Sequence, residues 1–561
     1  MNKFYSYILV FSFTVMIYGN ITASPLRERV YLQTDKNLYL AGETVLMKIL
    51  TTDTELIPID FSKTAYIELV SKDEALFQIM VEMKKGIGMG QMKLPTDLPS
   101  GYYRLIAYTQ FMRNESVDEF FEKNIVVINT FISGYYLSDE ELATENNINN
   151  DVKNDFVSIK LVCDKNNYPK RTNGQLTITQ LPENIHTLSV TIAGKDIIPT
   201  TETNVSLFNK NRKKISSVFT GGFLPEYEGH TIYGNIIDSQ TGNLTDEVLS
   251  KGISIPGDGI RFFAGQKVKT GEYRFITSGI TDSKEVATVI YHADEKYKME
   301  IVSPFVTHYI PTQMPELYID SVYYGQLLER SVALQALNYF SDNSLLNRKL
   351  HDPLLKLEPT RSFILDEYTR FTTMREVFTE FITGARFRRN SGKQEVQILI
   401  TRSDNYYEWG IMPLVLLDGA PIPNHDAIFK FDPLLVEKIN IYNTPIVMGG
   451  LWFDGIVELI TYTGLRQGLD LDKSTQILSY EGPQSQYNID YPDYSNEKNR
   501  YPRIPDSRHT LLWKPDIILD GNSYVHLPFS TSDLTGEFQI TVEGVTKDGK
   551  IVVGTTVFVV E

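Results

Sequence analysis

The sequence has one cysteine, Cys163, in 561 residues. An exported animal protein of this length would normally carry several disulfide bonds, so a single thiol favours a bacterial periplasm or cell surface. Residues 161–163 have the pattern of a strand entering a core, and no histidine or asparagine accompanies Cys163 in a recognisable nucleophile motif. We therefore interpret Cys163 as a buried structural thiol.

Positive charge is scarce relative to negative charge. The chain has 54 Lys and Arg against 70 Asp and Glu, for a net charge of -16. Nucleic acid would require a concentrated basic face, and anionic lipid would repel this charge. The composition argues against both kinds of partner. The simplest role of the acidic charge is to keep a large protein soluble.

Long hydrophobic runs are absent after the first residues. Lys3 precedes an apolar run at 7–18, and small residues follow at 21–24, which is the pattern of a signal peptide over residues 1–24. No cysteine lies near the cleavage site, so a lipoprotein is not expected. No later stretch of about 18 apolar residues exists that could cross a bilayer. We predict an exported protein that is periplasmic or associated with the outer membrane, with peripheral rather than integral attachment.

Motifs of catalysis and cofactor binding are missing too. The eight histidines form neither His-x-x-x-His nor His-Glu-x-x-His, the spacings that bring two imidazoles to one metal ion. There is no Gly-x-Ser-x-Gly elbow and no glycine-rich phosphate loop. Asp470 and Asp472 could hold calcium, but the glycine and glutamate of an EF-hand are absent, which favours a solvated loop. The sequence predicts no catalytic residue, no metal and no cofactor, and hence a protein that is not an enzyme.

Aromatic residues are plentiful, and they favour β-structure. The chain has 33 Tyr and 29 Phe, and aromatic rings fit the half-buried surface of a sheet. From Val30 onward, short alternating runs are separated by turn residues, which is typical of strands in sandwiches. The length exceeds one hydrophobic core and predicts about three to five domains.

One short motif occurs twice. Residues 34–39 (Thr-Asp-Lys-Asn-Leu-Tyr) are similar to residues 163–168 (Cys-Asp-Lys-Asn-Asn-Tyr), and a strand-like run precedes each copy. Repetition at domain-length spacing predicts two copies of one module. A structural role is sufficient, because Asp-Lys-Asn forms a turn and the tyrosine anchors the next strand against the core.

Helical periodicity interrupts the β pattern in two places. Leu328, Val332, Ala336 and Phe340 recur at intervals of four and predict an amphipathic helix with these residues as its apolar face. Residues 373–376 have the spacing of a capping box, which predicts the start of a short helix. Strands and helices then alternate over about a hundred residues, as expected of a compact α+β domain.

The residues that follow Val30 resemble a known family. Residues 31–45, with Thr-Asp-Lys, a tyrosine and Gly-Glu at the expected spacing, resemble the opening of the macroglobulin-type domain of α2-macroglobulins and their bacterial relatives. The turn at 238–242 with the strand at 271–273 is similar, less specifically, to a carboxypeptidase regulatory-type sandwich. Residues 413–461 are similar to the plug domain of TonB-dependent outer-membrane receptors.

This order of modules resembles Bacteroidetes envelope proteins that join a macroglobulin-like module to a receptor-plug module. The resemblance implies a mainly β fold of tandem immunoglobulin-like or macroglobulin-like β-sandwiches plus one small α+β plug-like domain. Two departures limit what it implies about function. Fewer than a hundred residues follow Gly464, too few for the barrel of a transporter. Cys163 does not stand in the Cys-Gly-Glu-Gln thioester motif that covalent protease trapping requires.

The predicted division of the chain follows from these patterns. An Asn-rich acidic stretch and a Tyr-Pro-Asn-Asp tract mark the non-strand segments. The segments are a signal peptide (1–24), a macroglobulin-like sandwich (25–130), a linker (131–153), a second macroglobulin-like β region (154–215), a carboxypeptidase-regulatory-like sandwich (216–312), a helical connector (313–350), a plug-like α+β domain (351–466), an extended loop (467–504) and a C-terminal β-sandwich segment (505–561).

We predict a non-catalytic scaffold or binding protein of the cell envelope, docking an envelope protein through its plug-like domain, with an outer-membrane barrel as one such partner. Strand edges and turns that are exposed in an isolated plug-like domain would provide the contact. We expect two exposed segments to form it. The predicted partner-binding residues are Asp418, Gly419 and Pro421 in one loop, and Trp452, Phe453 and Asp454 in one bend.

Two other classes of function remain open. A surface protein that captures glycans or nutrients would need an exposed aromatic platform, and the tyrosines between 487 and 501 are candidates, although such a series more often pins a loop to its own protein. A hydrolase with an unrecognised carboxylate site would need an acid, a base and a nucleophile converging in a cleft. A glycan array tests the first alternative, and the presence of such a cleft tests the second.

Overall fold

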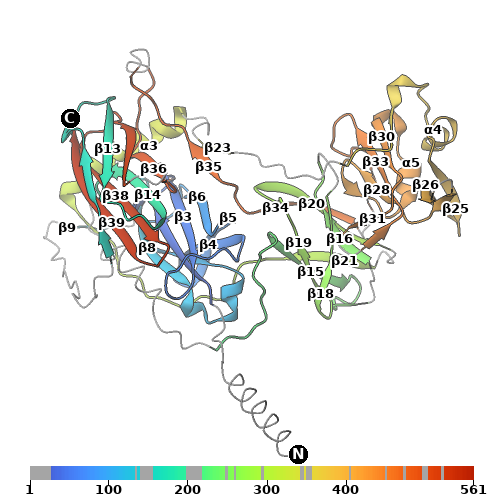
Figure 1. Ribbon diagram of the computed structural model, residues 1–561, viewed down its shortest axis with the longest axis horizontal. Helices are drawn as coiled ribbons and strands as arrows, with labels where there is room; N and C mark the ends of the chain where they lie inside the picture. The colour runs from blue at the N-terminus through green and yellow to red at the C-terminus, as the bar shows by residue number, and fades with distance from the viewer. Residues whose placement is uncertain are drawn as a thin grey trace, which may run out of the picture.

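The computed structural model describes residues 27–132, 136–138, 156–196, 218–246, 250–257, 261–291, 296–340, 346–348, 357–403, 406–448, 451–469, 471, 475–495, 503–517, 519 and 523–561. The predicted signal peptide and most of the predicted linker lie outside these residues. The fold is mainly β, as predicted. Figure 1 shows two lobes: the blue, teal and red strands form one, and the green and orange strands form the other.

The first sandwich is the N-terminal half of the larger lobe. Its strands hydrogen-bond in the order β1-β3-β6-β5-β4-β7-β8-β2, and short helical turns η1 (Phe111–Asn114) and η2 (Val117–Glu119) precede the last long strand. The strands are β1 (Arg29–Thr34), β2 (Leu38–Leu40), β3 (Thr44–Thr52), β4 (Thr64–Ser71), β5 (Glu74–Lys84), β6 (Ile87–Lys93), β7 (Gly101–Tyr108) and β8 (Phe121–Ile128).

The second sandwich is built from two distant stretches of the chain. One sheet has the order β10-β39-β38-β14-β36 with β12 beside β39, and the other has the order β11-β13-β37. The strands are β10 (Phe156–Ser158), β11 (Lys160–Cys163), β12 (Asn167–Tyr168), β13 (Asn173–Thr179), β14 (Ile185–Gly194), β36 (Thr510–Lys514), β37 (Tyr524–Ser530), β38 (Gly536–Thr546) and β39 (Ile551–Val560). The predicted division into separate regions at 154–215 and 505–561 is therefore corrected, because these strands share one core.

The two sandwiches have the same connectivity. The pairs β1–β3, β3–β6, β4–β5, β4–β7 and β7–β8 of the first sandwich correspond to β11–β13, β13–β37, β14–β36, β14–β38 and β38–β39 of the second. The parallel pair β2–β8 likewise corresponds to β12–β39. The structure thus confirms two copies of one module.

The second copy differs by a large insertion. In the first sandwich β4 and β5 are joined by the two residues between Ser71 and Glu74. In the second sandwich the equivalent strands β14 and β36 are separated by residues 195–509, yet the backbone N–H of Gly194 still donates to the carbonyl of His509 at 3.0 Å. The insertion therefore leaves and re-enters the sandwich at one hairpin position.

The repeated motif has the same geometry in both copies. The hydroxyl of Tyr39 donates to Asp35 at 2.8 Å and accepts from the backbone N–H of Lys36 at 3.1 Å. The hydroxyl of Tyr168 donates to Asp164 at 2.6 Å and accepts from the N–H of residue 165 at 3.2 Å. Each tyrosine closes the turn before the parallel strand, as the sequence predicts.

Removing these hydroxyls tests the equivalence of the two turns. We expect Tyr39→Phe and Tyr168→Phe each to cost about 1–3 kcal/mol, because each change leaves a backbone N–H without its acceptor. Urea unfolding of the full chain, followed separately for each sandwich by amide hydrogen exchange, measures the cost. Tyr524→Phe is the control, since this ring is about half exposed, and an equal effect of all three changes would contradict the assignment.

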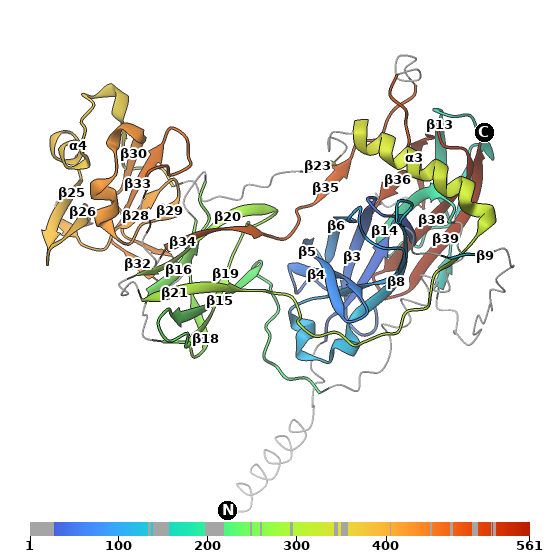
Figure 2. The ribbon, with the colours of Figure 1, turned by 180° about the vertical axis from the view of Figure 1, so that it is seen from behind.

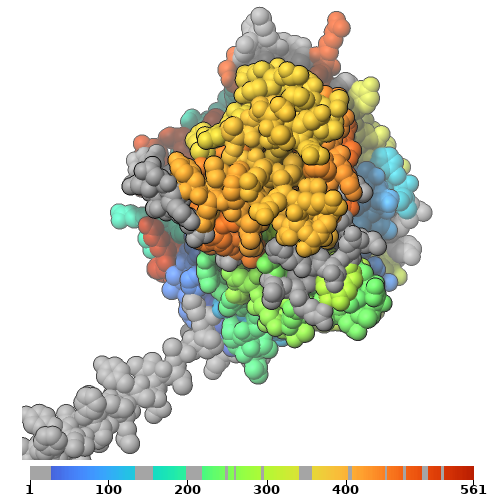
Figure 3. All heavy atoms as spheres, turned by 90° about the vertical axis from the view of Figure 1, so that its right-hand side faces the viewer, coloured from blue at the N-terminus to red at the C-terminus, as the bar shows by residue number. Residues whose placement is uncertain are grey.

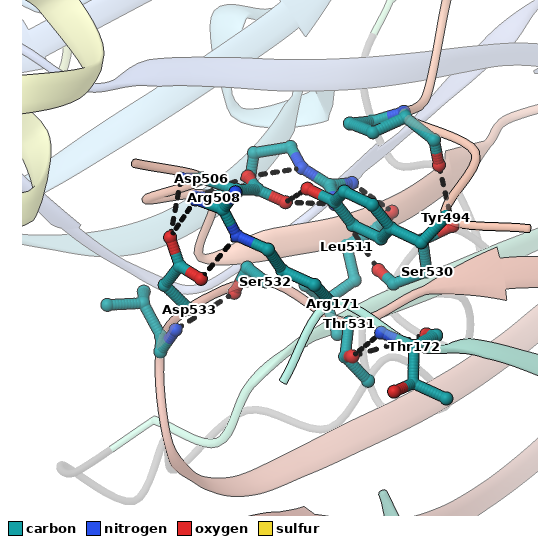
Figure 4. A network of polar contacts seen from close by, with 12 residues as sticks. Arg171, Thr172, Tyr494, Asp506, Arg508, Leu511, Ser530, Thr531, Ser532 and Asp533 are labelled. Atoms are coloured by element: carbon teal, nitrogen blue, oxygen red, sulfur yellow. Dashed lines mark hydrogen bonds and ion pairs between the residues drawn. The ribbon is translucent and has the colours of Figure 1, made fainter. Parts of the chain in front are cut away.

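The return of the insertion to the second sandwich is held by a polar network (Figure 4). Arg171 donates to both carboxylate oxygens of Asp533 at 2.6 Å, and Asp533 accepts from the backbone N–H of Asp506 at 2.8 Å. Arg508 in turn donates to both oxygens of Asp506 at 2.8 and 2.6 Å. Arg171 has φ 48° where the first copy has Gly42 at φ 90°, so this bidentate pair offsets a backbone conformation that favours glycine.

The smaller lobe begins with an inserted sandwich. Its two sheets have the orders β18-β19-β15-β21 and β17-β16-β20-β34. The strands are β15 (Thr231–Asp238), β16 (Ser250–Ser254), β17 (Phe262–Ala264), β18 (Gln266–Lys269), β19 (Glu272–Ile276), β20 (Ser283–Tyr291), β21 (Tyr297–Val302) and β34 (Thr475–Glu481). Because β34 completes a sheet, the predicted extended loop at 467–504 is wrong for this segment.

An α+β module is carried beside the inserted sandwich (Figure 3). Its main sheet has the order β24-β30-β33-β28-β29, with a second sheet β25-β26-β27 and a hairpin β31–β32. Its elements are β24 (Arg361–Ile364), η5 (Leu365–Glu367), α4 (Met374–Glu380), β25 (Ala385–Asn390), β26 (Lys393–Ser403), β27 (Tyr406–Gly410), β28 (Leu414–Leu417), β29 (Ala420–Pro421), α5 (His425–Lys430), η6 (Pro433–Leu435), β30 (Val436–Tyr442), β31 (Ile446–Met448), β32 (Leu451–Phe453) and β33 (Ile456–Thr461).

The helix α3 (Tyr324–Phe340) lies across the larger lobe (Figure 2). The short turn η3 (Ser321–Tyr323) precedes it, and the pairs β22 (Tyr318–Asp320) with β9 (Tyr136–Ser138) and β23 (Leu346–Arg348) with β35 (Tyr487–Ile489) flank it. The helix buries Leu327, Ser331 and Ala333, whereas Leu328 and Val332 are 52% and 58% exposed. The predicted apolar face is therefore wrong in position.

No described helix has the length and apolar character needed to cross a membrane.

The two sandwiches of the larger lobe meet across a buried polar layer. The hydroxyl of Ser189 donates to Gln33 at 2.5 Å, and the ammonium of Lys48 donates to the hydroxyl of Thr187 at 2.7 Å. Glu543 lies in the same layer and is 2% exposed. Burial of so many polar groups makes this interface sensitive to their charge.

The protonation of two of these groups depends on pH within the ordinary range. Burial raises the pKa of Glu543 from 4.5 to about 7, although Lys123 and Lys48 oppose the shift. Burial also lowers the pKa of Lys48 from 10.5 to about 8, against the attraction of Asp516 and Glu543. The folded state keeps a proton on Glu543 that the unfolded state loses between pH 4.5 and 7, so stability falls as pH rises through that window. Between pH 10.5 and 8 the unfolded state binds a proton at Lys48 that the folded state does not, so stability falls as pH falls through that window. Both groups are charged between pH 7 and 8, and the interface is weakest there.

We expect Glu543→Gln to stabilise the second sandwich by about 3 kcal/mol at pH 8 and by little at pH 4.5. The amide keeps the shape of the protonated acid and removes the charge that burial disfavours. Trp513, which is buried in the second sandwich, reports unfolding in a chain with Trp409→Phe and Trp452→Phe. Glu537→Gln at the exposed start of the same strand is the control, and a gain that is equal at both pH values would contradict the assignment.

Candidate functional site

A hairpin of the α+β module presents a hydrophobic surface. In the hairpin of β31 and β32, Val447 pairs directly with Trp452, so both side chains lie on one face. Ile411 and Met412 follow β27 and are joined to Trp452 through hydrogen bonds to the carboxylate of Asp454. Their exposed fractions are 64% for Ile411, 42% for Met412, 58% for Val447 and 54% for Trp452. We call these four residues the Trp452 surface.

The carboxylate of Asp454 holds the Trp452 surface together. It accepts from the backbone N–H groups of Ile411 and Met412 at 2.9 and 3.0 Å, and from the indole N–H of Trp452 at 3.3 Å. Gly410 leaves the room for it, because a Cβ there would lie 2.4 Å from Asp454. The predicted site residue Asp454 is thus buried, and it positions the exposed residues instead of facing solvent.

Strand alternation sends Phe453 to the opposite face. Phe453 is 4% exposed and packs edge-on against Phe262 and Tyr291 of the inserted sandwich, with ring centroids 5.5 and 5.8 Å apart. Leu414 and Ile456 belong to the same core cluster. The expectation that Phe453 is exposed is wrong, because it forms the joint between the α+β module and the inserted sandwich.

The loop of Asp418, Gly419 and Pro421 is buried as well. Asp418 and Gly419 have φ 49° and 79° and form the predicted two-residue turn between β28 and β29. The carboxylate of Asp418 accepts from the backbone N–H and the hydroxyl of Thr461, both at 2.7 Å. The carbonyl of Gly419 accepts from the hydroxyl of Ser254 at 2.7 Å. The predicted exposure of this loop is wrong, because it lies against the inserted sandwich.

The structure therefore separates the two predicted segments. Asp418 follows β28 and bonds the end of the parallel strand β33, whereas residues 452–454 precede the start of β33. Only Trp452 among the six predicted residues is largely exposed. The neighbours Ile411, Met412 and Val447 were missed. Two apolar residues before Pro413, between two strands, are the only sign of them in the sequence.

No candidate metal centre is found in the described part of the chain. Its residues contain no group of three or more His, Cys, Asp and Glu side chains placed to hold a metal ion, and Asp470 and Asp472 lie outside the described residues. Cys163 is half-buried, not fully buried as predicted. Burial, together with Asp164, raises the pKa of its thiol, which disfavours the nucleophilic thiolate.

Comparison with known proteins identifies the first sandwich. A model of the MG2 domain family matches residues 29–122, which confirms the macroglobulin-like prediction for that part of the chain. No curated protein matches the chain.

Solved structures give distant likenesses. Trypsin-activated alpha-2-macroglobulin from Escherichia coli is 9% identical with a TM-score of 0.25, over 95% of this chain and 41% of that one. Salmonella alpha-2-macroglobulin reacted with methylamine is 9% identical with a TM-score of 0.25, over 96% and 40%. The Escherichia coli adhesin FdeC is 10% identical with a TM-score of 0.14, over 48% and 60%. The chain thus spans about two fifths of the length of the two macroglobulins.

Proposed function

We propose that this chain is a non-catalytic binding protein of the bacterial cell envelope and that the Trp452 surface docks a protein partner. The observation that carries the proposal is the exposed pair of Val447 and Trp452 on one hairpin face, together with the exposed Ile411 and Met412 in the segment that Asp454 joins to that hairpin. Contiguous exposed apolar residues mark interaction sites in soluble proteins, and tryptophan and methionine are enriched at interfaces.

The rigidity of this surface supports the proposal. Asp454 accepts three hydrogen bonds, two from the backbone after β27 and one from the indole of Trp452. Phe453 packs the hairpin against the inserted sandwich. A surface that is already ordered loses little conformational entropy when it binds. Trp452 has the character of a binding hot spot, because it is a large exposed ring paired with the apolar Val447.

The position of the module within the molecule also supports docking. The two repeated sandwiches form one lobe, and the α+β module lies at the far end of the other lobe (Figure 1). The macroglobulin-like base would then act as a scaffold that holds the module away from it. The partner that we propose is an outer-membrane protein, because residues 413–461 resemble receptor plug domains and a plug is held by surrounding protein. Export by the signal peptide at 1–24 is part of the same proposal.

The test is capture of the partner from native cell envelopes. We expect the tagged full-length protein to retain one outer-membrane protein after mild cross-linking, and Trp452→Ser to abolish this capture, because the change removes the central ring while leaving Phe453 in place. Tyr524→Ser, at an exposed ring of the second sandwich, is the matched control and should capture as well as the unchanged chain. Undiminished capture by Trp452→Ser would overturn the proposal, as would binding to a glycan array with no protein recovered.

A further inference from the structure

A cleft lies where the insertion meets the two repeated sandwiches. It has a volume of about 210 Å³ and opens between the first sandwich, the helix α3 and the segment that returns from the insertion. None of its walls belongs to the α+β module. Its existence depends on the nested architecture, since residues far apart in the chain provide its three sides.

The walls of the cleft are largely apolar. Its apolar lining residues include Leu46 of the first sandwich, Leu334 and Leu337 of α3, and Ile489 and Leu534. Enclosed cavities of about 150 Å³ that are lined only by apolar side chains bind molecules of the size of benzene. The space therefore suits an apolar body of a few carbon atoms.

One buried nitrogen in the lining has no partner. His509 lines the cleft, and its Nδ1 is buried without a hydrogen bond within the described structure. Its ring packs directly on Gly194, where a Cβ would lie 2.5 Å from Nε2. Burial, with Arg330 and Lys36 nearby, holds the pKa of His509 well below its usual value. The buried Nδ1 of this neutral imidazole is therefore an unsatisfied polar atom in the wall of the cleft.

The charge of the lining is opposite to that of the chain. Four cationic residues line the cleft (Lys36, Lys93, Arg330 and Arg508) against two anionic residues (Asp35 and Glu43). The carboxylate of Asp506 outside the lining balances Arg508, so one positive charge remains, whereas the whole chain carries -16. Salt bridges occupy the other three cations. Lys93 is exposed and has no ion pair within the described residues.

We propose that this cleft binds a small carboxylate with an apolar body, in which Lys93 supplies the counter-charge. The apolar body would lie between α3 and Leu46. Such a group occurs in a short-chain or medium-chain carboxylic acid and in the C-terminal residue of a peptide that ends in leucine. The site is separate from the Trp452 surface, so either proposal can fail alone.

Titration of the full chain with hexanoate tests the proposal. By calorimetry and ligand-observed NMR, we expect hexanoate to bind about tenfold more tightly than hexan-1-ol, because of one charge-assisted hydrogen bond. Hexylamine should not compete. A peptide that ends in leucine distinguishes the two sources. If the peptide with a free C-terminus competes with hexanoate and the amidated peptide does not, the site is assigned to a peptide terminus. If neither peptide competes, the site is assigned to a free acid.

Variants locate the binding. We expect Lys93→Gln to weaken hexanoate about tenfold and leave hexan-1-ol unchanged, and Leu337→Trp to abolish both by filling the cleft. Val332→Trp on the solvent face of the same helix is the control and should bind both as before. The proposal is overturned if the unchanged chain does not bind hexanoate, if hexylamine binds equally well, or if Lys93→Gln and Leu337→Trp both bind like the control.

Discussion

Replacing Arg330 with alanine should release the helix α3 from the first sandwich. The guanidinium of Arg330 donates to both carboxylate oxygens of Glu43 at 2.9 and 2.8 Å, and to the carbonyl of Leu38 at 3.0 Å. Lys36 pairs with the same carboxylate at 2.9 Å. Burial alone would raise the pKa of Glu43, but the two cations outweigh it and hold that pKa well below the usual value.

Loss of one partner from such a buried group leaves an uncompensated charge, at a cost of about 3–5 kcal/mol. The opening equilibrium of α3 should then rise at least a hundredfold. Hydrogen exchange of the amides of residues 324–340 measures this opening. Arg375→Ala is the control, since Arg375 is exposed on α4. The double variant Glu43→Gln, Arg330→Met removes both charges and should restore part of the protection of the α3 amides from exchange. Equal protection in Arg330→Ala and Arg375→Ala would show that the ion pair does not hold the helix.

Replacing Phe453 with alanine should loosen the α+β module from the inserted sandwich, whereas the same change at Trp452 should not. Phe453 fills a joint with Phe262 and Tyr291, and removal of a buried phenylalanine side chain costs about 3–5 kcal/mol. Trp452 is about half exposed and donates one hydrogen bond to Asp454, so Trp452→Ala should cost about 1 kcal/mol, well below the cost of Phe453→Ala.

These neighbouring positions form a matched pair for one experiment. Limited proteolysis and hydrogen exchange of β31, β32 and β17 should report early opening in Phe453→Ala only. Partner capture should be lost in both variants, in Phe453→Ala because the hairpin is no longer held and in Trp452→Ala because the contact is gone. Equal stability of the two variants would contradict the division of roles between the two faces of the strand.

Local features of the fold could be predicted from the sequence. The turn closed by Tyr39 and repeated at Tyr168 depends only on residues within six positions, and both copies have the predicted geometry. The capping box is similarly local, since Thr373 accepts from the backbone N–H of Glu376. The fold class followed from short alternating runs, which report burial on one side of a strand.

Long-range pairing could not be predicted. The strands β14 and β36 are neighbours although residues 195–509 lie between them, and nothing in a local pattern states which strand a given edge will meet. The same limit explains the error in α3. Its intervals of four are real, but the buried face is set by Arg330, Leu327 and Ser331 meeting the first sandwich, a contact that periodicity alone does not reveal.

The predicted site had a similar outcome. A turn at Asp418 and a bend at Trp452 were found from local residue types, but exposure depends on what packs against them. The inserted sandwich covers Gly419 and Phe453 and leaves Trp452 open. Because that sandwich contacts them from more than a hundred residues away in the chain, only the three-dimensional arrangement separates the joint from the surface.

Site-specific photo-cross-linking at Val447 in intact cells tests the central claim most directly. Val447 is paired with Trp452 on the exposed face, so a photoreactive amino acid there would touch a partner that docks on this surface. We expect one discrete adduct with an outer-membrane protein. This adduct should be lost when Trp452→Ser is combined with the probe, and it should be absent when the same probe replaces Val332 on α3. No adduct at Val447, or an adduct that persists with Trp452→Ser, would contradict the account.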